Sequence, residues 1–401
     1  MRIHFLGIGG SGASAAAAIA QAQGFEVTGC DLEPQNEFTT PFQTSQLFKG
    51  HNPKHLEGVD ILAVTPAIFS LDPDNPELVT AKQNGIPVMT WQQFLGEYLT
   101  KNKFVIAVCG THGKTTTTAM IAQMLEDANL DPTVELGAID PRWGKNFRVG
   151  KGKYFVIEAD EFNDNFLHFK PDITVVTNIE MDHPEYFKDF ASVKKSFTKF
   201  KSQSKKVFDK PNPGLIKFKL QVAGKFNVAN ASLAFQVGLA LDLDPKVIRK
   251  SLANYQGVSR RFEYIGEFRG AKVFSDFGHH PTEIKVTIQA VREKFPKNII
   301  LLIYQPHMFS RTKALFGDFV KVFKNLSADK TFIMDIYPSR EVDTGLVSSK
   351  QLAETVGKSG VKYTNWEDLK KELPGFVKKG DVLFFMGAGD IDKYARDLAA
   401  N

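Results

Sequence analysis

The chain has few cysteines and no long apolar run, and these two absences exclude several classes of protein. Cys30 and Cys109 are the only cysteines in 401 residues, too few for the disulfide framework of a small secreted domain. No apolar stretch in the sequence reaches the roughly 20 residues that a membrane-spanning helix needs. We therefore expect a protein of the reducing cytoplasm that does not act at a membrane.

Charge of one sign is not in large excess either. The sequence contains 50 Lys and Arg against 45 Asp and Glu, a net charge of +5. The densest basic stretch, Lys194–Lys210, has seven lysines and one acid, and most runs of this kind are solvated helix faces. This balance suits a small anionic substrate, and we expect no nucleic-acid partner. Nothing in the sequence calls for an obligate protein partner.

What the sequence does contain is an alternation of short apolar runs with helical patterns, typical of α/β domains with parallel sheets. A chain of 401 residues is too long for one core. Three segments each begin a strand–turn–helix pattern, so we expect three domains: a Rossmann-like domain at 1–102, a P-loop ATPase-like domain with a parallel sheet at 103–222, and a Rossmann-like domain at 223–401. Predicted strands include 3–6, 25–28, 61–64, 87–89, 104–108, 154–157, 173–176, 299–303, 331–334 and 382–385, with helices at 13–23 and 115–128.

A glycine-rich loop follows the predicted strand 104–108. It reads Gly110-Thr111-His112-Gly113-Lys114-Thr115-Thr116 and is tighter than the general phosphate-loop pattern. Glycines of such a loop let backbone N–H groups surround phosphates at a helix N-terminus, the lysine reaches the terminal phosphates, and the next hydroxyl can ligate Mg²⁺. The alternative is an ordinary glycine turn, but such a turn gives no packing reason for the Lys114–Thr115 pair. We expect ATP binding here.

A second glycine turn lies near the N-terminus. Gly7, Gly9 and Gly12, with Asp31 nineteen residues further on, match a dinucleotide-binding fingerprint. The pattern predicts a diphosphate at a helix end without naming the nucleotide. A purely structural glycine turn remains the alternative.

Polar residues follow two strands of the central region. Glu158, Asp160 and Glu161 come directly after strand 154–157, where a phosphate-loop domain carries its Mg²⁺ acid. Residues 178–184, which contain His183, follow strand 173–176. Solvent-facing charge is the alternative for the acids, and a structural role is as good an interpretation of His183 as metal binding.

Three further loops in the last third of the chain are rich in arginine, histidine and acid. Arginine suits carboxylates and phosphates through its bidentate fork. Because His279 and His280 are adjacent, at most one of them is expected to face a ligand. These candidates are Arg260, Arg261, Asp276, His279, His307 and Arg311.

Taken in order, the motifs resemble those of the Mur ligases over nearly the whole chain. They are GIGGSG, GTHGKTTTT, EADE, TNIEMDHPEYF, GKFNVANA, GVSRRFE, DFGHHPTE, QPHMFSRT, DIYPSRE and MGAGDI. Two of them, QPHMFSRT and GHHPTE, are similar to the branch of the family that adds alanine. The resemblance implies an ATP- and Mg²⁺-dependent ligase that joins L-alanine to UDP-N-acetylmuramate in peptidoglycan precursor synthesis.

The resemblance also implies roles for individual residues. Catalysis would depend on Lys114, Glu158, His183, His307 and Arg311. The UDP-sugar would bind Gly7, Gly9, Gly10, Gly12 and Asp31. ATP would bind residues 110–116 together with Asn227, Asn230, Arg260, Arg261 and Asp276. The metal would bind Thr115, Glu158 and His183. The acceptor amino acid would bind His279, His307 and Arg311.

Two departures from the family pattern leave alternatives open. Only 40 residues separate His183 from Gly224, fewer than usual in the family, so the missing part should be peripheral strands of the central domain. Phe226 stands where a histidine usually precedes the adenine-side asparagine. The alternatives are a muropeptide-recycling Mur ligase, a non-catalytic nucleotide-binding relative, and a nicotinamide-dependent dehydrogenase that uses only the first glycine turn.

Overall fold

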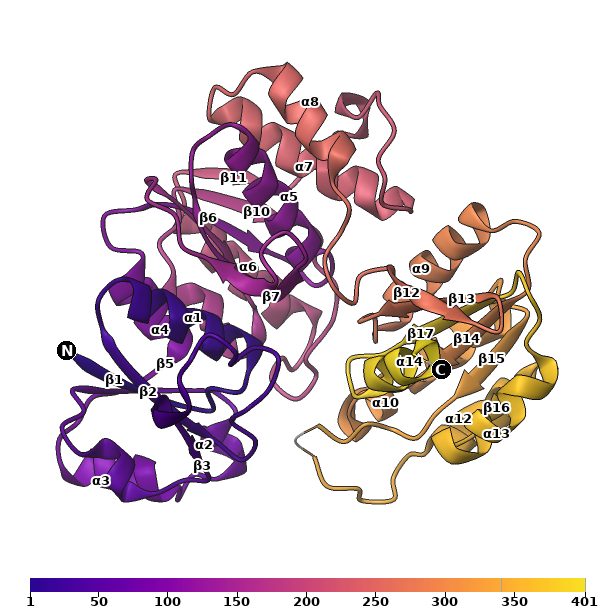
Figure 1. Cartoon of the computed structure of the whole chain (residues 1–401), viewed down its shortest axis with the longest axis horizontal. Coiled ribbons are helices and arrows are strands. Elements are labelled where there is room, and N and C mark those ends of the chain that lie inside the picture. Colours follow the sequence, from indigo (N-terminus) through magenta and orange to yellow (C-terminus); the bar gives the residue numbers. More distant parts are fainter. Residues whose placement is uncertain (340, 401) are drawn as a thin grey trace. The chain divides into compact units, whose positions relative to one another are not determined.

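Three β-sheets organise the chain, all with mainly parallel strands (Figure 1). The computed structural model describes residues 1–339 and 341–400, so Arg340 of the DIYPSRE motif lies outside the described residues. The chain divides into two compact units. Unit 1 comprises Met1–Met181, Asp189–Lys219 and Ala229–Tyr255 and holds the first two sheets; unit 2 comprises Asp182–Lys188, Leu220–Val228 and the chain from Gln256 onward and holds the third.

The first sheet has five parallel strands in the order β3-β2-β1-β4-β5. This is a doubly wound order, and the glycine turn comes directly after its central strand. The predicted strands and the predicted helix are present, each within three residues of the expected bounds. The elements are β1 (Arg2–Leu6), α1 (Ser11–Ala22), β2 (Glu26–Asp31), η1 (Thr44–Gln46), β3 (Leu47–Lys49), η2 (Pro53–Leu56), β4 (Ile61–Val64), α2 (Ile68–Leu71), α3 (Pro76–Gln83), β5 (Val88–Thr90), α4 (Trp91–Phe94) and η3 (Leu95–Leu99).

Helix α1 is buried on all sides over the eight consecutive residues Ala13 to Ala20. A helix on the surface of a single sheet would expose one face to water. Here α1 contacts its own sheet and also β7 and β8 of the second sheet, and Nδ2 of Asn146 donates a 2.5 Å hydrogen bond to the carbonyl oxygen of Ser11. Alanine suits this position because its small side chain lets both layers approach the helix.

The second sheet has six strands in the order β11-β10-β6-β9-β7-β8, of which only β8 runs antiparallel to its neighbour. Strands β6, β9 and β10 confirm the predicted strands, whereas the β7–β8 hairpin was not predicted. The elements are β6 (Phe104–Cys109), α5 (Lys114–Asp127), β7 (Thr133–Asp140), β8 (Lys145–Arg148), β9 (Tyr154–Glu158), η4 (Phe162–His168), β10 (Ile173–Val176), α6 (Phe190–Ser202), β11 (Lys206–Phe208), η5 (Pro213–Leu215), α7 (Lys225–Ala240) and α8 (Pro245–Asn254).

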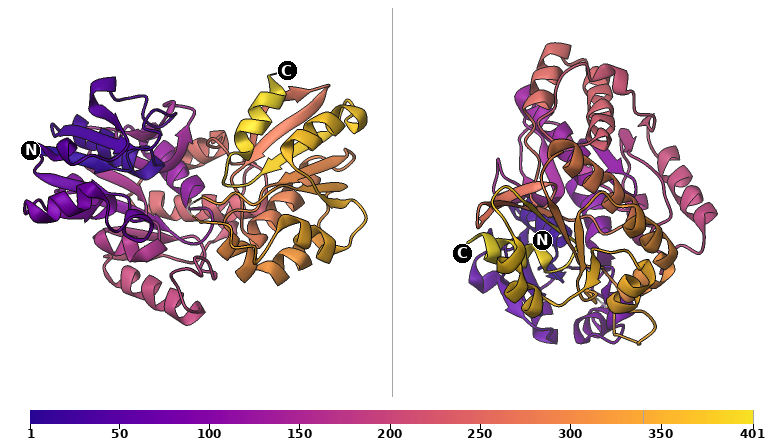
Figure 2. Two further views of the ribbon diagram at one scale, coloured as in Figure 1. Left: turned by 90° about the horizontal axis from the view of Figure 1, so that it is seen from below. Right: turned by 90° about the vertical axis from the view of Figure 1, so that its right-hand side faces the viewer.

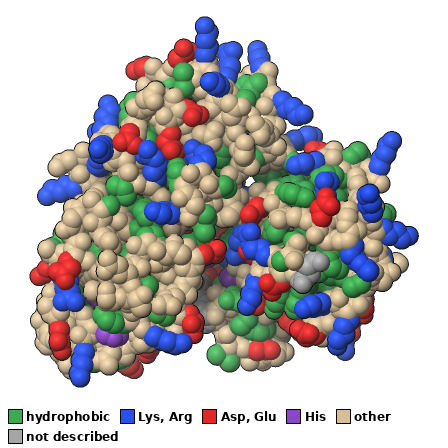
Figure 3. Space-filling view, viewed as in Figure 1, with side chains coloured by type: hydrophobic (Ala, Val, Ile, Leu, Met, Phe, Trp, Pro, Cys, Tyr) green, Lys and Arg blue, Asp and Glu red, His purple; other side chains and the backbone are tan. Residues whose placement is uncertain are grey.

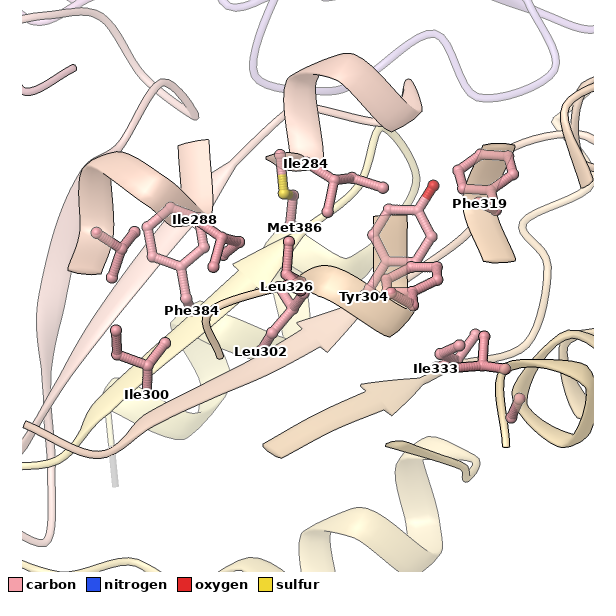
Figure 4. Packing of buried hydrophobic residues seen from close by; sticks show 14 of the residues in the cluster. Ile284, Ile288, Ile300, Leu302, Tyr304, Phe319, Leu326, Ile333, Phe384 and Met386 are labelled. Carbon is pink, nitrogen blue, oxygen red and sulfur yellow. The ribbon is translucent and has the colours of Figure 1, made fainter. Parts of the chain in front are cut away.

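The third sheet has the order β12-β13-β17-β14-β15-β16 and is antiparallel only at β12. Helices cover both of its faces (Figure 2). On one face, Ile284 and Ile288 of α9 pack against Leu302, Tyr304 and Phe384 (Figure 4). The elements are β12 (Glu263–Phe268), β13 (Ala271–Asp276), α9 (Pro281–Lys294), β14 (Ile300–Tyr304), α10 (Phe309–Ala314), α11 (Phe316–Asn325), β15 (Lys330–Ile333), α12 (Ser349–Val356), β16 (Val361–Tyr363), α13 (Trp366–Phe376), β17 (Val382–Met386) and α14 (Ile391–Ala399).

The basic stretch Lys194–Lys210 falls largely on α6, as a solvated helix face. Val193, Phe197 and Phe200 are buried, while Lys194, Lys195 and Lys199 point to solvent. On the face of the molecule that Figure 3 draws, Lys and Arg are spread out with acidic side chains among them.

Two expectations from composition can be compared with the structure. Cys30 and Cys109 are both buried and free, as their scarcity led us to expect. Within the described residues, every helix is too short or too polar to cross a membrane.

Candidate active site

The loop after β6 has the backbone of a phosphate cradle. Gly110 and Gly113 have φ angles of 132° and 82°, which a residue with a Cβ adopts only with strain. A Cβ on Gly113 would also lie 2.8 Å from Oδ1 of Asn230. The loop opens directly into α5, so the N–H groups at the start of that helix form an end of the type that binds anions such as phosphate. The predicted adenine-side residue Asn230 therefore lies beside the loop.

The segment that follows β10 fixes this loop from the side. Oδ1 of Asn178 accepts a 2.9 Å hydrogen bond from the N–H of His112, and its Nδ2 donates a 2.9 Å bond to the carbonyl of the same residue. The hydroxyl of Thr177 donates to that carbonyl as well, and the hydroxyl of Thr111 accepts from the N–H of Glu180 at 2.8 Å. The cradle is thus held in shape by side chains of its own unit.

Lys114 is held among carbonyl and carboxylate oxygens. Its Nζ lies 2.7 Å from the carbonyl oxygen of Gly110, 2.8 Å from Oε2 of Glu161 and 3.6 Å from Oδ1 of Asp160. Burial alone would lower the pKa of Lys114, but the two carboxylates raise it above its usual value. The lysine is therefore a permanent cation at the mouth of the loop.

A carboxylate capable of holding Mg²⁺ lies at the end of β9. Oε1 of Glu158 accepts a 2.9 Å hydrogen bond from the hydroxyl of Thr115, and Oε2 accepts one of 2.9 Å from the N–H of Gly137. Glu135 lies beside it, and burial together with the charge of Glu158 raises the pKa of Glu135 well above its usual value. Hard oxygen donors on neighbouring elements fit Mg²⁺, so Thr115 and Glu158 remain the proposed ligands. Thr116 follows on the partly exposed side of α5.

The glycine turn of the first domain is organised by Asp31. Its Oδ2 accepts a 3.0 Å hydrogen bond from the N–H of Gly9, and a Cβ at Gly9 would lie 2.8 Å from the same oxygen. Gly7 has a φ of 87°, and a Cβ on Gly12 would collide with the ring of Trp91. Gly10 precedes α1 and its N–H donates to the carbonyl of Gly7. The residues predicted to bind the UDP-sugar therefore form one turn, and Asp31 fixes the backbone of that turn at Gly9.

In unit 2, Arg311 forms a buried ion pair with Asp182. Nε and Nη2 of Arg311 lie 3.1 and 3.0 Å from Oδ1 of Asp182, and Arg311 is only 3% exposed. Nη1 lies 3.2 Å from Nδ1 of His307, which stacks on Tyr337. Burial alone would raise the pKa of Asp182, but Arg311 and His183 hold it far below its usual value.

Two further residues near the Arg311–Asp182 ion pair are His183 and His279. His183 has a φ of 53° and its Nδ1 lies 3.1 Å from Oε1 of Glu185. Burial would raise the pKa of Glu185, but that hydrogen bond lowers it to about 2. The ring of His279 lies 5.6 Å from that of His307. His183 belongs to unit 2, while Thr115 and Glu158 belong to unit 1, so its metal role stays a prediction.

The side chains of the two adjacent histidines have different surroundings. His279 faces Arg311 and His307, whereas His280 caps helix α9. The Nδ1 of His280 accepts from the N–H of Thr282 at 3.2 Å. Asp276 accepts hydrogen bonds from Phe262 and Gly278, and burial raises its pKa to about 6 although Arg261 opposes this.

The remaining arginines and asparagine bond backbone carbonyls or lie over an aromatic ring. Nη2 of Arg260 donates to the carbonyls of Gly387 and Gly389 at 2.8 and 2.9 Å. Arg260 and Arg261 both lie over the ring of Phe277. Asn227 bonds the carbonyl of Ala223. The nucleotide-binding roles of these residues stay predictions.

We expect His279 to be neutral at physiological pH. Burial, with the charge of Arg311 as the next cause, lowers the pKa of His279 to about 4, against an ordinary value of about 6.5. A histidine NMR titration should show His279 keeping the chemical shifts of a neutral imidazole down to about pH 5. The variant His279→Gln assigns the signal. An inflection of the His279 signal near pH 6.5 would contradict the buried environment described here.

Two groups of this site were missing from the predicted residues. Glu161 was noted only as part of an acidic motif, yet it is the carboxylate nearest to Lys114. Asp182 was noted only as a neighbour of His183, yet it is the partner of Arg311. The acid type and the position at a strand end were signals for both, but which cation each would meet depends on contacts between distant segments.

Three family models together match most of the chain. The model of the Mur ligase family catalytic domain matches residues 2–103, that of the Mur ligase middle domain residues 108–207, and that of the Mur ligase glutamate ligase domain residues 260–389. The order of the three matches is the order of the three sheets.

Curated relatives match over almost their whole length. UDP-N-acetylmuramate–L-alanine ligase of Clostridium tetani is 36% identical over 99% of this chain and 97% of the relative, and that of Aquifex aeolicus is 35% identical over the same shares. Among solved structures, UDP-N-acetylmuramate-alanine ligase of Thermotoga maritima superposes with a TM-score of 0.83 at 27% identity, covering 100% of this chain and 98% of that one. A murein peptide ligase of Psychrobacter arcticus has a TM-score of 0.69 at 22% identity, with the same coverage.

Proposed function

The chain belongs to the Mur ligase family, and we propose that it joins L-alanine to the carboxylate of UDP-N-acetylmuramate with the energy of ATP. The observation that carries this proposal is the match, over nearly the whole chain, with relatives named for that reaction. The geometry of the phosphate loop supports it, because Lys114, Thr115 and Glu158 are arranged as an ATP site requires.

In the proposed reaction, the substrate carboxylate attacks the γ-phosphorus of ATP. The products of this step are an acyl phosphate and ADP. The amine of L-alanine then attacks the acyl carbon, and the tetrahedral intermediate expels phosphate. The side chains bind and orient the reactants, and no covalent intermediate with the enzyme is required.

The residues of the loop would act by holding charge. Lys114 places a cation at the terminal phosphates, and the N–H groups at the start of α5 neutralise the others. Thr115 and Glu158 would hold Mg²⁺, which when bound neutralises phosphate oxygens as charge develops in the transition state. Glu161 keeps the ammonium of Lys114 directed across the loop at 2.8 Å.

The test is phosphate release by the full chain with ATP, Mg²⁺ and UDP-N-acetylmuramate, with each amino acid added singly. We expect turnover with L-alanine and none when any one component is omitted. Adding an L-alanyl peptide in place of L-alanine tests the muropeptide-recycling alternative, which predicts the opposite preference. Failure of every amino acid and peptide would contradict the ligase function and favour a non-catalytic relative.

We also expect the first glycine turn to bind the diphosphate of a UDP-sugar rather than a nicotinamide nucleotide. Calorimetric titration with UDP-N-acetylmuramate should give saturable binding. Gly9→Val should weaken it at least about tenfold, because the new side chain meets Asp31 and blocks the backbone from the diphosphate. Gly317→Val is the matched control, since a Cβ there meets nothing within 4 Å and, as at Gly9, the φ angle is not positive. Tight NADH binding without UDP-sugar binding would reverse the assignment.

A further inference from the structure

The first domain contains a group of metal-ligating side chains that the ligase reaction does not use. They are His4 of β1, Cys30 of β2, His55 of η2 and Glu77 of α3. One nitrogen, sulfur or oxygen atom from each lies within 4.8 Å of those of the other three. The side chains of His4, Cys30 and Glu77 are buried, and that of His55 is 14% exposed.

The fold brings the first two of these side chains to one face of the sheet. Strands β1 and β2 are parallel, with His4 opposite Thr28 and Leu6 opposite Cys30. Residues two apart on a strand point to the same face, and Leu6 and Cys30 share a core with Leu56 of η2. His4 and Cys30 therefore project toward the same layer, which η2 and α3 form.

The other two side chains enter from that layer. Glu77 is the second residue of α3, and one of its oxygens, Oε1, accepts a 2.9 Å hydrogen bond from the N–H of Asn52. Nδ1 of His55 lies 2.9 Å from the same oxygen. Sγ of Cys30 lies 3.2 and 3.3 Å from the two carboxylate oxygens. Cys30 and His55, together with His4, thus surround the buried carboxylate of Glu77.

One donor in the group has no hydrogen bond. Nδ1 of His4 is 2.9 Å from the hydroxyl of Thr28, which orients the ring so that Nε2 faces Glu77. Nε2 is buried, lies 3.2 Å from Oε2 of Glu77, and makes no hydrogen bond of acceptable geometry within the described residues. A fully buried imidazole nitrogen beside a carboxylate, with a thiol sulfur in the same group of atoms within 4.8 Å, is placed where a metal ion could be bound.

We propose that His4, Cys30, His55 and Glu77 form a tetrahedral site for Zn²⁺. One thiolate, two imidazoles and one carboxylate are a ligand set that Zn²⁺ accepts, and Mg²⁺ does not favour sulfur. With bonds of about 2.0 Å to nitrogen and oxygen and 2.3 Å to sulfur, tetrahedral ligand atoms lie about 3.3–3.5 Å apart. The other three donors lie 2.9–3.2 Å from the nearest carboxylate oxygen of Glu77, and all four ligand atoms lie within 4.8 Å of one another, so binding the metal needs only a small rearrangement.

A fifth side chain supports the sulfur. Nδ1 of His51 lies 3.3 Å from Sγ of Cys30, so it can donate to a thiolate once Cys30 has released its proton to solvent. All four positions of the metal would be filled by protein, which is typical of a structural rather than a catalytic zinc. The site would connect β1 and β2 to η2 and α3, and the proposal does not depend on the ligase function.

The test uses the full chain, first treated with a chelator and then titrated with Zn²⁺ and, separately, with Co²⁺. Excess Mg²⁺ is present throughout to occupy the oxygen ligands Thr115 and Glu158. We expect one equivalent of Zn²⁺ by native mass spectrometry, a higher Tm with the metal bound, and a thiolate-to-cobalt charge-transfer band with the intense visible bands of tetrahedral Co²⁺. These readouts need no substrate and no turnover.

Matched variants locate the metal. Cys30→Ser should abolish the charge-transfer band and weaken Zn²⁺ binding by at least about 100-fold, the upper end of what loss of a supporting group costs. Cys109→Ser and His168→Gln, a cysteine and a histidine outside the group, should retain the band. His51→Ala should weaken binding about 10- to 100-fold. If circular dichroism shows that Cys30→Ser does not fold, the variant His55→Gln replaces it as the test, because His55 is partly exposed. His55→Gln should also lose Zn²⁺ affinity.

Three results would overturn the proposal. The first is a wild-type chain that takes up no Zn²⁺ in the presence of excess Mg²⁺. The second is a charge-transfer band that survives Cys30→Ser, and the third is a Zn²⁺ affinity that is unchanged in His55→Gln.

Discussion

Lys114→Ala should lower the rate of L-alanine-dependent phosphate release by about 10²–10³-fold, which corresponds to roughly 3–4 kcal/mol of transition-state stabilisation. The reason is that Nζ is the cation nearest to where the γ-phosphate would lie, and a preorganised charge in a site closed to water has a large effect on the rate. Steady-state kinetics with ATP and UDP-N-acetylmuramate at saturation measures the loss directly in kcat.

The partner of Lys114 makes a second variant necessary. Removing the lysine breaks its 2.8 Å ion pair with Glu161, whose carboxylate is 2% exposed, and breaking a buried ion pair destabilises a protein by several kcal/mol. The double variant Lys114→Ala/Glu161→Gln should recover the thermal stability but not the rate. Lys103→Ala is the matched control, because among residues 1–339 and 341–400 that lysine has one hydrogen bond, to the carbonyl of Gly152. A double variant with near-normal turnover would refute the role given to Lys114.

Arg311→Ala should have the largest effect on stability, about 3–5 kcal/mol, because it leaves Asp182 charged and buried. The structure commits two of the guanidinium nitrogens to one oxygen of that carboxylate. Asp182→Asn should also destabilise, since it keeps an acceptor but removes the opposite charge. Asp182→Asn/Arg311→Met should recover much of the loss, because a neutral pair needs no charge compensation. Chemical denaturation that monitors unit 2 gives the comparison.

The same set of variants distinguishes two functions of Arg311. If the arginine binds the carboxylate of the acceptor, as the sequence predicts, the stabilised double variant will show a raised KM for L-alanine. If it acts as a positioning residue for Asp182 and His183, kcat will fall and KM will change little. A double variant with wild-type values of both parameters would remove Arg311 from the site altogether.

Local sequence was sufficient for the parts of the fold that short patterns determine. The apolar run before Gly110, the glycines with positive φ and the lysine that opens α5 occur within a dozen residues, so the strand, loop and helix could be predicted together. The same holds for β1, the Gly7–Gly12 turn and α1. Edge strands such as β8, β12 and β16 carry mixed patterns with partly exposed residues, and their place depends on pairing with neighbours.

Long-range pairing was beyond what the patterns could show. Residue spacing gives no reason for Arg311 to meet Asp182, 129 positions earlier, or for Glu77 to meet His4. Burial makes such pairs specific, since a buried charge must find a partner, but the partner is selected by the tertiary fold. The family resemblance located the candidate residues without stating which of them bond one another.

The double-sided burial of α1 has a consequence for how the chain can be divided. A gene fragment that ends near residue 102 would leave the outer side of α1 without β7 and β8, and a row of alanines with Ile19 would face water. Such a fragment should aggregate or bind a hydrophobic dye, whereas a fragment that continues through residue 255 should not. Calorimetry of the longer fragment should then record a single endotherm for both sheets, since neither can melt while the shared helix stays in place. A single endotherm would make the boundary that family models draw between the first two domains a boundary of sequence homology and not of cooperative folding.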